Sequence, residues 1–171
     1  MKEKLSARVG VCADAAAAEE AAGIRIAVAP EIVCFVSRED RCRGPICSAV
    51  YQSAGDGSRK AVSCGLDAED GGEVPTLTIE VLREAGYLDP ENTSAPRSRR
   101  ADPAVLECCH AVYAVDEEIA MRLILGYPQL ASKIRCLGGQ IAPAAFDTAD
   151  EYRRVLKEAE KLIGGLTGGE I

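Results

Sequence analysis

The sequence has little positive charge. Its 171 residues include 20 Lys and Arg against 27 Asp and Glu, which gives a formal net charge of −7. A nucleic-acid backbone and an anionic membrane surface would both be repelled at long range, so we expect neither as a partner. A local basic pocket is still compatible with this charge balance.

Long hydrophobic runs are also missing. No apolar run approaches the roughly 20 residues that span a bilayer, and residues 1–20 lack the continuous hydrophobic segment of a signal peptide. We therefore expect a soluble, cytoplasmic protein. The length suits one domain, which we place at residues 31–171, preceded by an N-terminal extension at residues 1–30.

The cysteine pattern argues against a disulfide framework and against a metal site. Eight cysteines are present, but no CxxC pair is repeated and no export signal is visible, so we expect reduced thiols. Cys34, Cys64 and Cys136 lie in apolar runs and are expected in the core. Cys108 and Cys109 precede the single histidine, but consecutive residues on one element seldom converge on one ion. We expect no metal and no cofactor.

What is present from residue 30 onward is an alternation of short apolar β-type runs with helical patterns, which is typical of parallel βαβ units. Strands are expected at 32–36, 61–64, 110–115 and 133–137, and helices at 45–54, 76–86, 103–109, 116–126 and 150–166. The predicted fold is α/β: a four-stranded parallel sheet with helices on both faces. Residues 88–100 have turn chemistry and no period, so we expect a long surface loop there.

The N-terminal extension has no recognisable motif. A short helix with Asp14 as its cap and Gly23 as its stop is plausible, between two β-like runs. The extension could be an edge element or a surface for a protein partner.

The segment from Ser37 to Gly44 follows the first predicted strand and leads into the first helix. In doubly wound sheets, ligands bind beyond the carboxyl ends of the strands, and free N–H groups at a helix start attract anions. Arg43 is placed to grip a phosphate with two hydrogen bonds. Taken alone, this pattern fits an ordinary solvated turn equally well, in which Arg38, Arg41 and Arg43 would pair with Glu39 and Asp40.

A series of motifs resembles the low-molecular-weight protein tyrosine phosphatases and the related arsenate reductases. Their first loop, typically VCxGNxCRSP, reads VSREDRCRGP here, with Cys42, Arg43 and Pro45 in register. SCGLDAEDGGEVP stands where the family often has SAGTxAxxxGxP, and AVYAVDEE where it tends to have a strand ending in MD. The resemblance covers about residues 31–166. It implies a three-layer αβα fold with flavodoxin-like winding.

In that family, a loop cysteine attacks phosphorus, the arginine and loop amides stabilise the transition state, and a late aspartate protonates the leaving group. The resemblance implies the following phosphate-binding positions: Ser37, Arg38, Glu39, Asp40, Arg41, Cys42, Arg43 and Gly44. It makes Arg43 the transition-state ligand.

The sequence departs from the family at several positions that carry its chemistry. Ser37 replaces the nucleophilic cysteine, Glu39 replaces a glycine, and Gly44 replaces the serine that would stabilise a thiolate. Ala142 stands at the general-acid position, where the aspartate is lost. Asp147 is a possible substitute acid, although it lies five residues late and fits the start of the last helix.

Two functions stay open. One is a catalytically impaired phosphatase-like protein, a pseudophosphatase, whose loop still holds phosphate, a phosphorylated protein or another anion. The other is an active phosphatase for phosphotyrosine or phosphoarginine in which Ser37 is an artificial replacement, or, less favoured, an arsenate reductase. The joint losses at Glu39, Gly44 and Ala142 favour natural divergence and the first function.

Overall fold

The computed structural model describes residues 30–55, 57–91, 95–137 and 139–167. Its elements, in chain order, are β1 (Glu31–Ser37), α2 (Arg43–Ala54), β2 (Arg59–Gly65), α3 (Thr76–Glu84), α4 (Pro103–Cys108), β3 (Ala111–Ala114), α5 (Glu117–Gly126), a 3₁₀ turn at Pro128–Leu130, β4 (Ile134–Cys136) and α6 (Ala149–Thr167). Every helix and strand predicted from residue 31 onward is present, with ends that differ by at most a few residues. The expected helix at 13–23 and its flanking β-like runs lie outside the described residues, as does all but the last residue of the proposed extension.

The four strands form one parallel sheet in the order β2-β1-β3-β4. β1 lies inside the sheet, and its residues from Val33 to Ser37 are buried. A continuous apolar run such as IVCFV is typical of a strand covered on both faces. The predicted α/β fold with flavodoxin-like winding is confirmed.

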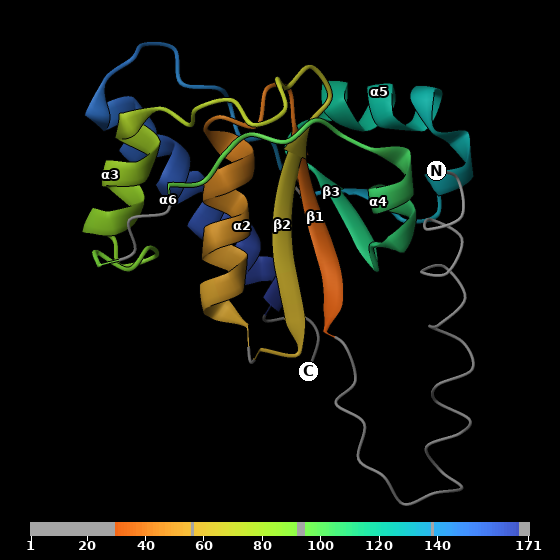
Figure 1. Ribbon diagram of the computed structural model, residues 1–171, viewed down its shortest axis with the longest axis horizontal. Coiled ribbons are helices and arrows are strands. Elements are labelled where there is room, and N and C mark those ends of the chain that lie inside the picture. Colours follow the sequence, from red (N-terminus) through yellow and green to blue (C-terminus); the bar gives the residue numbers. More distant parts are fainter. Residues whose placement is uncertain (1–29, 56, 92–94, 138, 168–171) are drawn as a thin grey trace, which may run out of the picture.

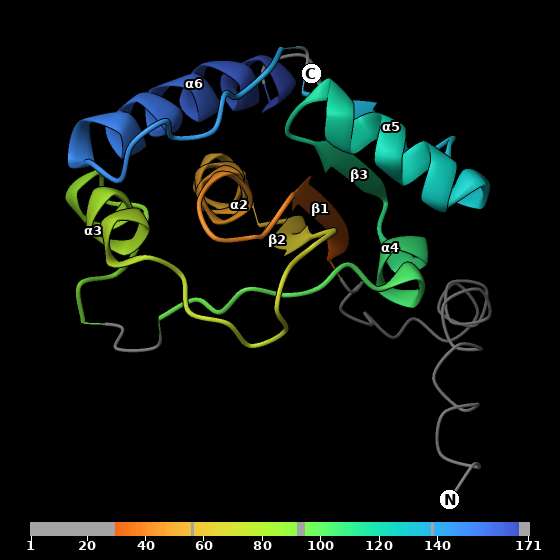
Figure 2. The same ribbon diagram turned by 90° about the horizontal axis from the view of Figure 1, so that it is seen from above.

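Helices cover both faces of the sheet (Figures 1 and 2). α2, α3 and α6 lie on one side, and α4 and α5 lie on the other. α2 packs against β1 and β2 and is itself covered by α6, while α5 packs against β3 and β4. The chain therefore returns repeatedly to the same edge of the sheet, and the loops that follow the strands gather there.

Local residues stabilise the starts of three helices. The Asp102 side chain accepts a hydrogen bond from the Ala104 N–H, and Asp116 accepts one from the Ile119 N–H at 2.8 Å. Both caps satisfy N–H groups that a helix start leaves free. The first helix begins at Arg43, so Pro45 stands inside its first turn, where a proline is tolerated.

The last helix buries one face. Tyr152, Val155, Leu156, Ala159 and Ile163 are its buried residues, at the three- and four-residue spacing of an amphipathic helix. Within the described residues, no helix is long and apolar enough to cross a membrane.

Two expectations were wrong. Cys34 and Cys64 are buried, but Cys136 is exposed, because it lies on a three-residue strand at the edge of the sheet. The predicted surface loop at 88–100 is only partly a surface loop. Ser98 is buried, and Arg100 pairs with Gly65 as an isolated parallel bridge. This end of the loop therefore packs against the end of β2.

Candidate functional site

A cavity of about 550 Å³ opens beyond the carboxyl ends of the strands. Its floor is the loop of residues 37–43, which we call the β1–α2 loop. The walls come from the start of α3, the start of α5 and the segment of residues 139–148 before α6, which we call the late loop. The lining residues outside the β1–α2 loop are Pro75, Asp116, Glu118, Ile119, Pro143, Ala144, Asp147 and Tyr152. The structure thus brings Ser37 through Arg43 together at one cavity.

The β1–α2 loop lies tightly on the end of β2. A Cβ atom at Gly65 would come within 2.7 Å of the Arg38 carbonyl oxygen and the Asp40 nitrogen, so no side chain fits there. The Leu66 N–H donates to the Ser37 carbonyl at 3.0 Å, and the Asp67 N–H donates to the Arg38 carbonyl at 2.7 Å. These contacts fix the backbone that carries Ser37.

The backbone N–H groups of this loop form an anion cradle. Among the described residues, the N–H groups of residues 38, 39 and 41–44 have no hydrogen-bond acceptor. The Asp40 N–H is the exception, because it donates to Ser37 Oγ at 3.1 Å. Such free amides at a helix start, with the helix dipole behind them, suit a phosphate-like group.

Arg43 forms an ion pair with the carboxylate of Asp116. Its Nη1 donates to Asp116 Oδ2 at 2.5 Å and to the Ile141 carbonyl at 3.1 Å, and its side chain is only 11% exposed. Asp116 uses its other oxygen to cap α5. The described contacts of Arg43 all use Nη1, so Nη2 and Nε are available to an anion in the cavity.

The other arginines of the β1–α2 loop do not form the ion pairs with Glu39 and Asp40 that the sequence allowed, as far as the described residues show. Arg38 forms an ion pair with Glu118 at 2.6 Å, across the cavity mouth. Within the described part of the chain, Arg41 makes no ion pair. Neither Glu39 nor Asp40 is paired with a loop arginine, because Arg38 and Arg43 reach α5 and its cap instead. The hypothesis of a self-neutralised loop is therefore wrong.

Asp40 is the most unusual residue of the site. Its φ of 54° lies in the left-handed region, which Asp tolerates, and it is only 1% exposed. Oδ2 accepts a hydrogen bond from the Arg99 N–H at 2.9 Å, whereas Oδ1 is buried and has no partner among the described residues. Burial raises the pKa of this carboxyl group to about 6, against smaller opposing effects of Ser63 and Arg99.

The Asp40 side chain leaves no room for a side chain at position 44. A Cβ atom at Gly44 would lie 2.6 Å from Asp40 Oδ1, 3.0 Å from Ser37 Oγ and 3.3 Å from Ser63 Cβ. The Asp40 carboxylate therefore occupies the place where a side chain at position 44 would begin.

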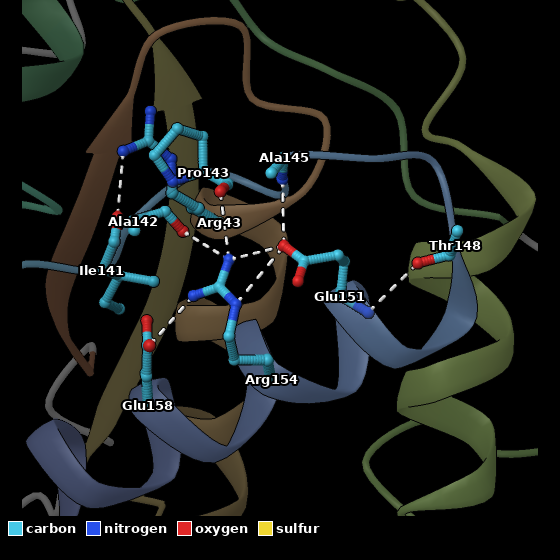
Figure 3. A network of polar contacts seen from close by, with 9 residues as sticks. All are labelled: Arg43, Ile141, Ala142, Pro143, Ala145, Thr148, Glu151, Arg154 and Glu158. Atoms are coloured by element: carbon cyan, nitrogen blue, oxygen red, sulfur yellow. Dashed lines mark hydrogen bonds and ion pairs between the residues drawn. The ribbon is translucent and has the colours of Figure 1, made fainter.

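The late loop is attached to α6 through Arg154 (Figure 3). Arg154 Nη2 donates to the carbonyl oxygens of Ala142 and Pro143, and Arg154 also pairs with Glu151 and Glu158. The Ala142 methyl group offers no proton for a leaving group.

Asp147, the possible substitute acid, both precedes α6 and lines the cavity. Its Oδ1 accepts a hydrogen bond from the Tyr152 hydroxyl at 3.0 Å. Burial and this contact raise the pKa of Tyr152 to about 12, so Tyr152 is a neutral donor at the cavity wall.

Cys42 does not supply a thiolate. Burial raises the pKa of its thiol to about 11, despite a smaller opposite effect of Arg43. It is a partly buried thiol that packs against the hydrophobic core.

Carboxylates outnumber guanidinium groups around the cavity. The acidic lining residues are Glu39, Asp40, Asp116, Glu118 and Asp147, and the basic ones are Arg38, Arg41 and Arg43. The amides attract an anion at the floor, while the rim is acidic. Sequence reasoning missed Asp116, Glu118 and Tyr152 as site residues. Asp116 could have been found, because it directly follows a predicted strand whose carboxyl end meets that of β1.

The chain matches no protein-family model and no curated protein sequence. Solved structures do match. The YwlE arginine phosphatase from Geobacillus stearothermophilus is 23% identical with a TM-score of 0.74, over 81% of this chain and 92% of that one. A low-molecular-weight protein tyrosine phosphatase from T. tengcongensis is 22% identical with a TM-score of 0.72, over 81% and 98% of the two chains. A mutant of YwlE described with a phosphorylated active-site serine is 19% identical with a TM-score of 0.71, over 80% and 93%.

These likenesses define the class of fold. The chain has the fold of the low-molecular-weight protein tyrosine phosphatases, as the sequence motifs predicted.

Proposed function

We propose that this chain is a diverged member of the low-molecular-weight phosphatase family that binds a phosphorylated group in its β1–α2 loop but does not turn it over. The observation that carries this proposal is the combination of free backbone N–H groups in the β1–α2 loop with Ser37 at the nucleophile position. The cradle and Arg43 provide binding. A serine hydroxyl is a far weaker nucleophile than a thiolate, and Ala142 provides no acid for the leaving group.

The solved neighbours support the binding half of the proposal. The YwlE mutant with a phosphorylated active-site serine indicates that this fold accommodates a phosphoryl group on a serine. The acidic rim of the cavity favours one kind of phosphorylated group. A phosphorylated group with a cationic neighbour, such as phosphoarginine, suits Glu118 and Asp147 better than phosphotyrosine does, because Ala144 and Ala145 stand at the late-loop positions where the family usually has aromatic residues to hold the ring.

Hydrolysis of 4-nitrophenyl phosphate tests the catalytic half. We expect no sustained release of nitrophenolate from the natural chain or from Ala142→Asp. Ser37→Cys should stay weak, because the Asp40 carboxylate disfavours a thiolate beside it and Gly44 offers no hydroxyl. Ser37→Cys combined with Ala142→Asp should be the most active form. Sustained turnover by the natural chain, or robust turnover by Ser37→Cys alone, would contradict the proposal.

Calorimetric titration with inorganic phosphate and with vanadate tests the binding half. The natural chain should bind both, and Arg43→Ala should lose most of the affinity. Arg135→Ala is the matched control, because Arg135 is an exposed residue of the edge strand β4. If phosphate and vanadate do not bind the natural chain, the loop has no anion-binding function.

A further inference from the structure

A buried carboxylate lies beside the hydroxyl group at the floor of the cavity. Asp40 Oδ1 and Ser37 Oγ both border the small space above the Gly44 Cα, within 2.6 and 3.0 Å of the point where a Cβ atom would stand. The Asp40 N–H already donates to Ser37 Oγ, which fixes that oxygen as an acceptor on this side. No hydrogen bond among the described residues uses the Ser37 hydroxyl proton, and Asp40 Oδ1, which also has no partner among them, borders the same space as Ser37 Oγ.

Burial of the Asp40 carboxylate destabilises the folded chain, which indicates that Asp40 has a function other than stability. Buried polar atoms are almost always hydrogen-bonded, and a buried carboxylate with an unpaired oxygen disfavours the folded state. The Ser63 hydroxyl and Arg99, through its backbone N–H and its charge, favour the charged form of Asp40 and offset part of this cost. An amide at position 40 would avoid the charge, because Asn has the same shape and also tolerates φ near 54°.

We propose that Ser37 accepts a phosphoryl group from an activated phosphate ester or acyl phosphate and retains it, with Asp40 as the base that takes the Ser37 proton. This inference rests on the proposed function, because the donor must first bind in the amide cradle. It adds a chemical step that mere binding does not include.

The step balances in atoms and electrons. Ser37 Oγ forms a bond to phosphorus, the bond between phosphorus and the leaving oxygen breaks, and the leaving group departs with that electron pair. The Ser37 proton moves to Asp40 Oδ1. The free amides and Arg43 Nη2 and Nε stabilise the charge on the three remaining phosphoryl oxygens. Because no acid stands at Ala142, the donor must have a leaving group that is stable as an anion, such as nitrophenolate or a carboxylate.

Retention follows from the same residues. Hydrolysis of the phosphoserine would need a water molecule activated from the late loop, where Ala142 has no carboxylate and Asp147 already accepts a hydrogen bond from the Tyr152 hydroxyl. The alkoxide of serine is also a much poorer leaving group than a thiolate. The chain should therefore react once per molecule and keep the phosphoryl group.

Intact-mass measurement of the full chain after incubation with 4-nitrophenyl phosphate or acetyl phosphate tests the step. The natural chain should gain the mass of one phosphoryl group, mapped to Ser37 by peptide sequencing, with a matching single burst of nitrophenolate. Ser37→Ala should gain none. Asp40→Asn should react slower by on the order of 100-fold, which is typical of losing a general base. Asp150→Asn, at an exposed carboxylate on α6, should react at the natural rate.

The pH profile separates a base from a merely structural residue. The labelling rate of the natural chain should rise as pH passes about 6, where Asp40 ionises, and level off above. The Asp40→Asn rate should be flat over this range. An equal rate and profile in the two forms would overturn the role of Asp40. Phosphate binding without labelling would overturn this inference but leave the proposed function standing, whereas absence of phosphate binding would overturn the proposed function.

Discussion

At the scale of single residues, Asp40 couples the stability of the fold to pH. Its pKa of about 6 in the folded chain lies above the ordinary value of 3.8, because burial disfavours the charged form. Between these two pH values the folded chain binds more protons than the unfolded chain does. The free energy of unfolding should therefore decrease as pH rises from about 4 to 6, by up to about 3 kcal/mol, and change no further above that window through this residue.

Asp40→Asn should remove this effect. We expect the natural chain and the variant to unfold at similar urea concentrations at pH 4, where Asp40 is mostly protonated in the folded chain. At pH 7.5 the variant should be more stable by about 2 kcal/mol, because it keeps the shape without the buried charge. Asp150→Asn is the control, since that side chain is 95% exposed. Parallel stability curves for the natural chain and Asp40→Asn would contradict the prediction.

Single residues also mark the limit of what the sequence predicts. The positions of Ser37, Arg43 and Ala142 in the phosphatase motifs could be named from the sequence, and the structure places Ser37 and Arg43 at the cavity. The partner of Arg43 could not be named. It pairs with Asp116, 73 residues away: the order of the strands places Asp116 near the β1–α2 loop, but no local pattern indicates the contact itself. The same holds for Arg99, whose backbone holds Asp40.

At the scale of elements, the C-terminal half of α6 is less stable than its packing allows. Gly164 and Gly165 lie inside this helix, and an added Cβ atom would meet nothing within 4 Å at either position. Alanine loses less backbone entropy than glycine on folding. Gly164→Ala and Gly165→Ala should therefore each raise the free energy of unfolding by about 0.5–1 kcal/mol.

Urea denaturation followed by circular dichroism measures this effect, and Gly65→Ala provides the contrast. Its Cβ atom would press into the backbone of the β1–α2 loop, so that change should destabilise the fold by about 1–3 kcal/mol. If alanine at position 164 or 165 destabilised the chain, the open space beside those residues would be in doubt.

Elements were predicted more reliably than their connections. The amphipathic spacing of α6 and the apolar run of β1 fix their type, because burial of one helix face or of a whole strand requires such patterns. The residues just before α4 carry no periodic pattern, yet Ser98 is buried and donates to the Glu69 carbonyl at 2.6 Å. Its burial depends on a turn from another part of the chain, which periodicity does not report.

At the scale of the whole molecule, charge governs access to the cavity. The chain has a formal net charge of −7, and carboxylates line the cavity rim. Glu118→Gln should tighten phosphate binding roughly three- to ten-fold at low salt, because it removes a negative charge and releases Arg38 from its ion pair. Titration calorimetry checks this. Glu84→Gln also breaks an ion pair, with Arg153 on α6, and should leave phosphate affinity unchanged.

The whole fold could be predicted because its rules are general. Alternating strands and helices give a parallel sheet whose strand ends meet at one edge, and the order of the phosphatase-like motifs selects one winding. The acidic rim could not be predicted, because it combines residues from the β1–α2 loop, α5 and the late loop that meet only after folding.

The attachment of the late loop to α6 has a kinetic consequence. Arg154 holds the carbonyl oxygens of Ala142 and Pro143, and Glu151 accepts a hydrogen bond from the Ala145 N–H at 3.0 Å (Figure 3). One wall of the cavity is thus in place before a ligand arrives, and entry needs no slow closing step. In stopped-flow mixing with vanadate, the observed association rate should rise in proportion to vanadate concentration, without the plateau that a preceding or following conformational change would impose.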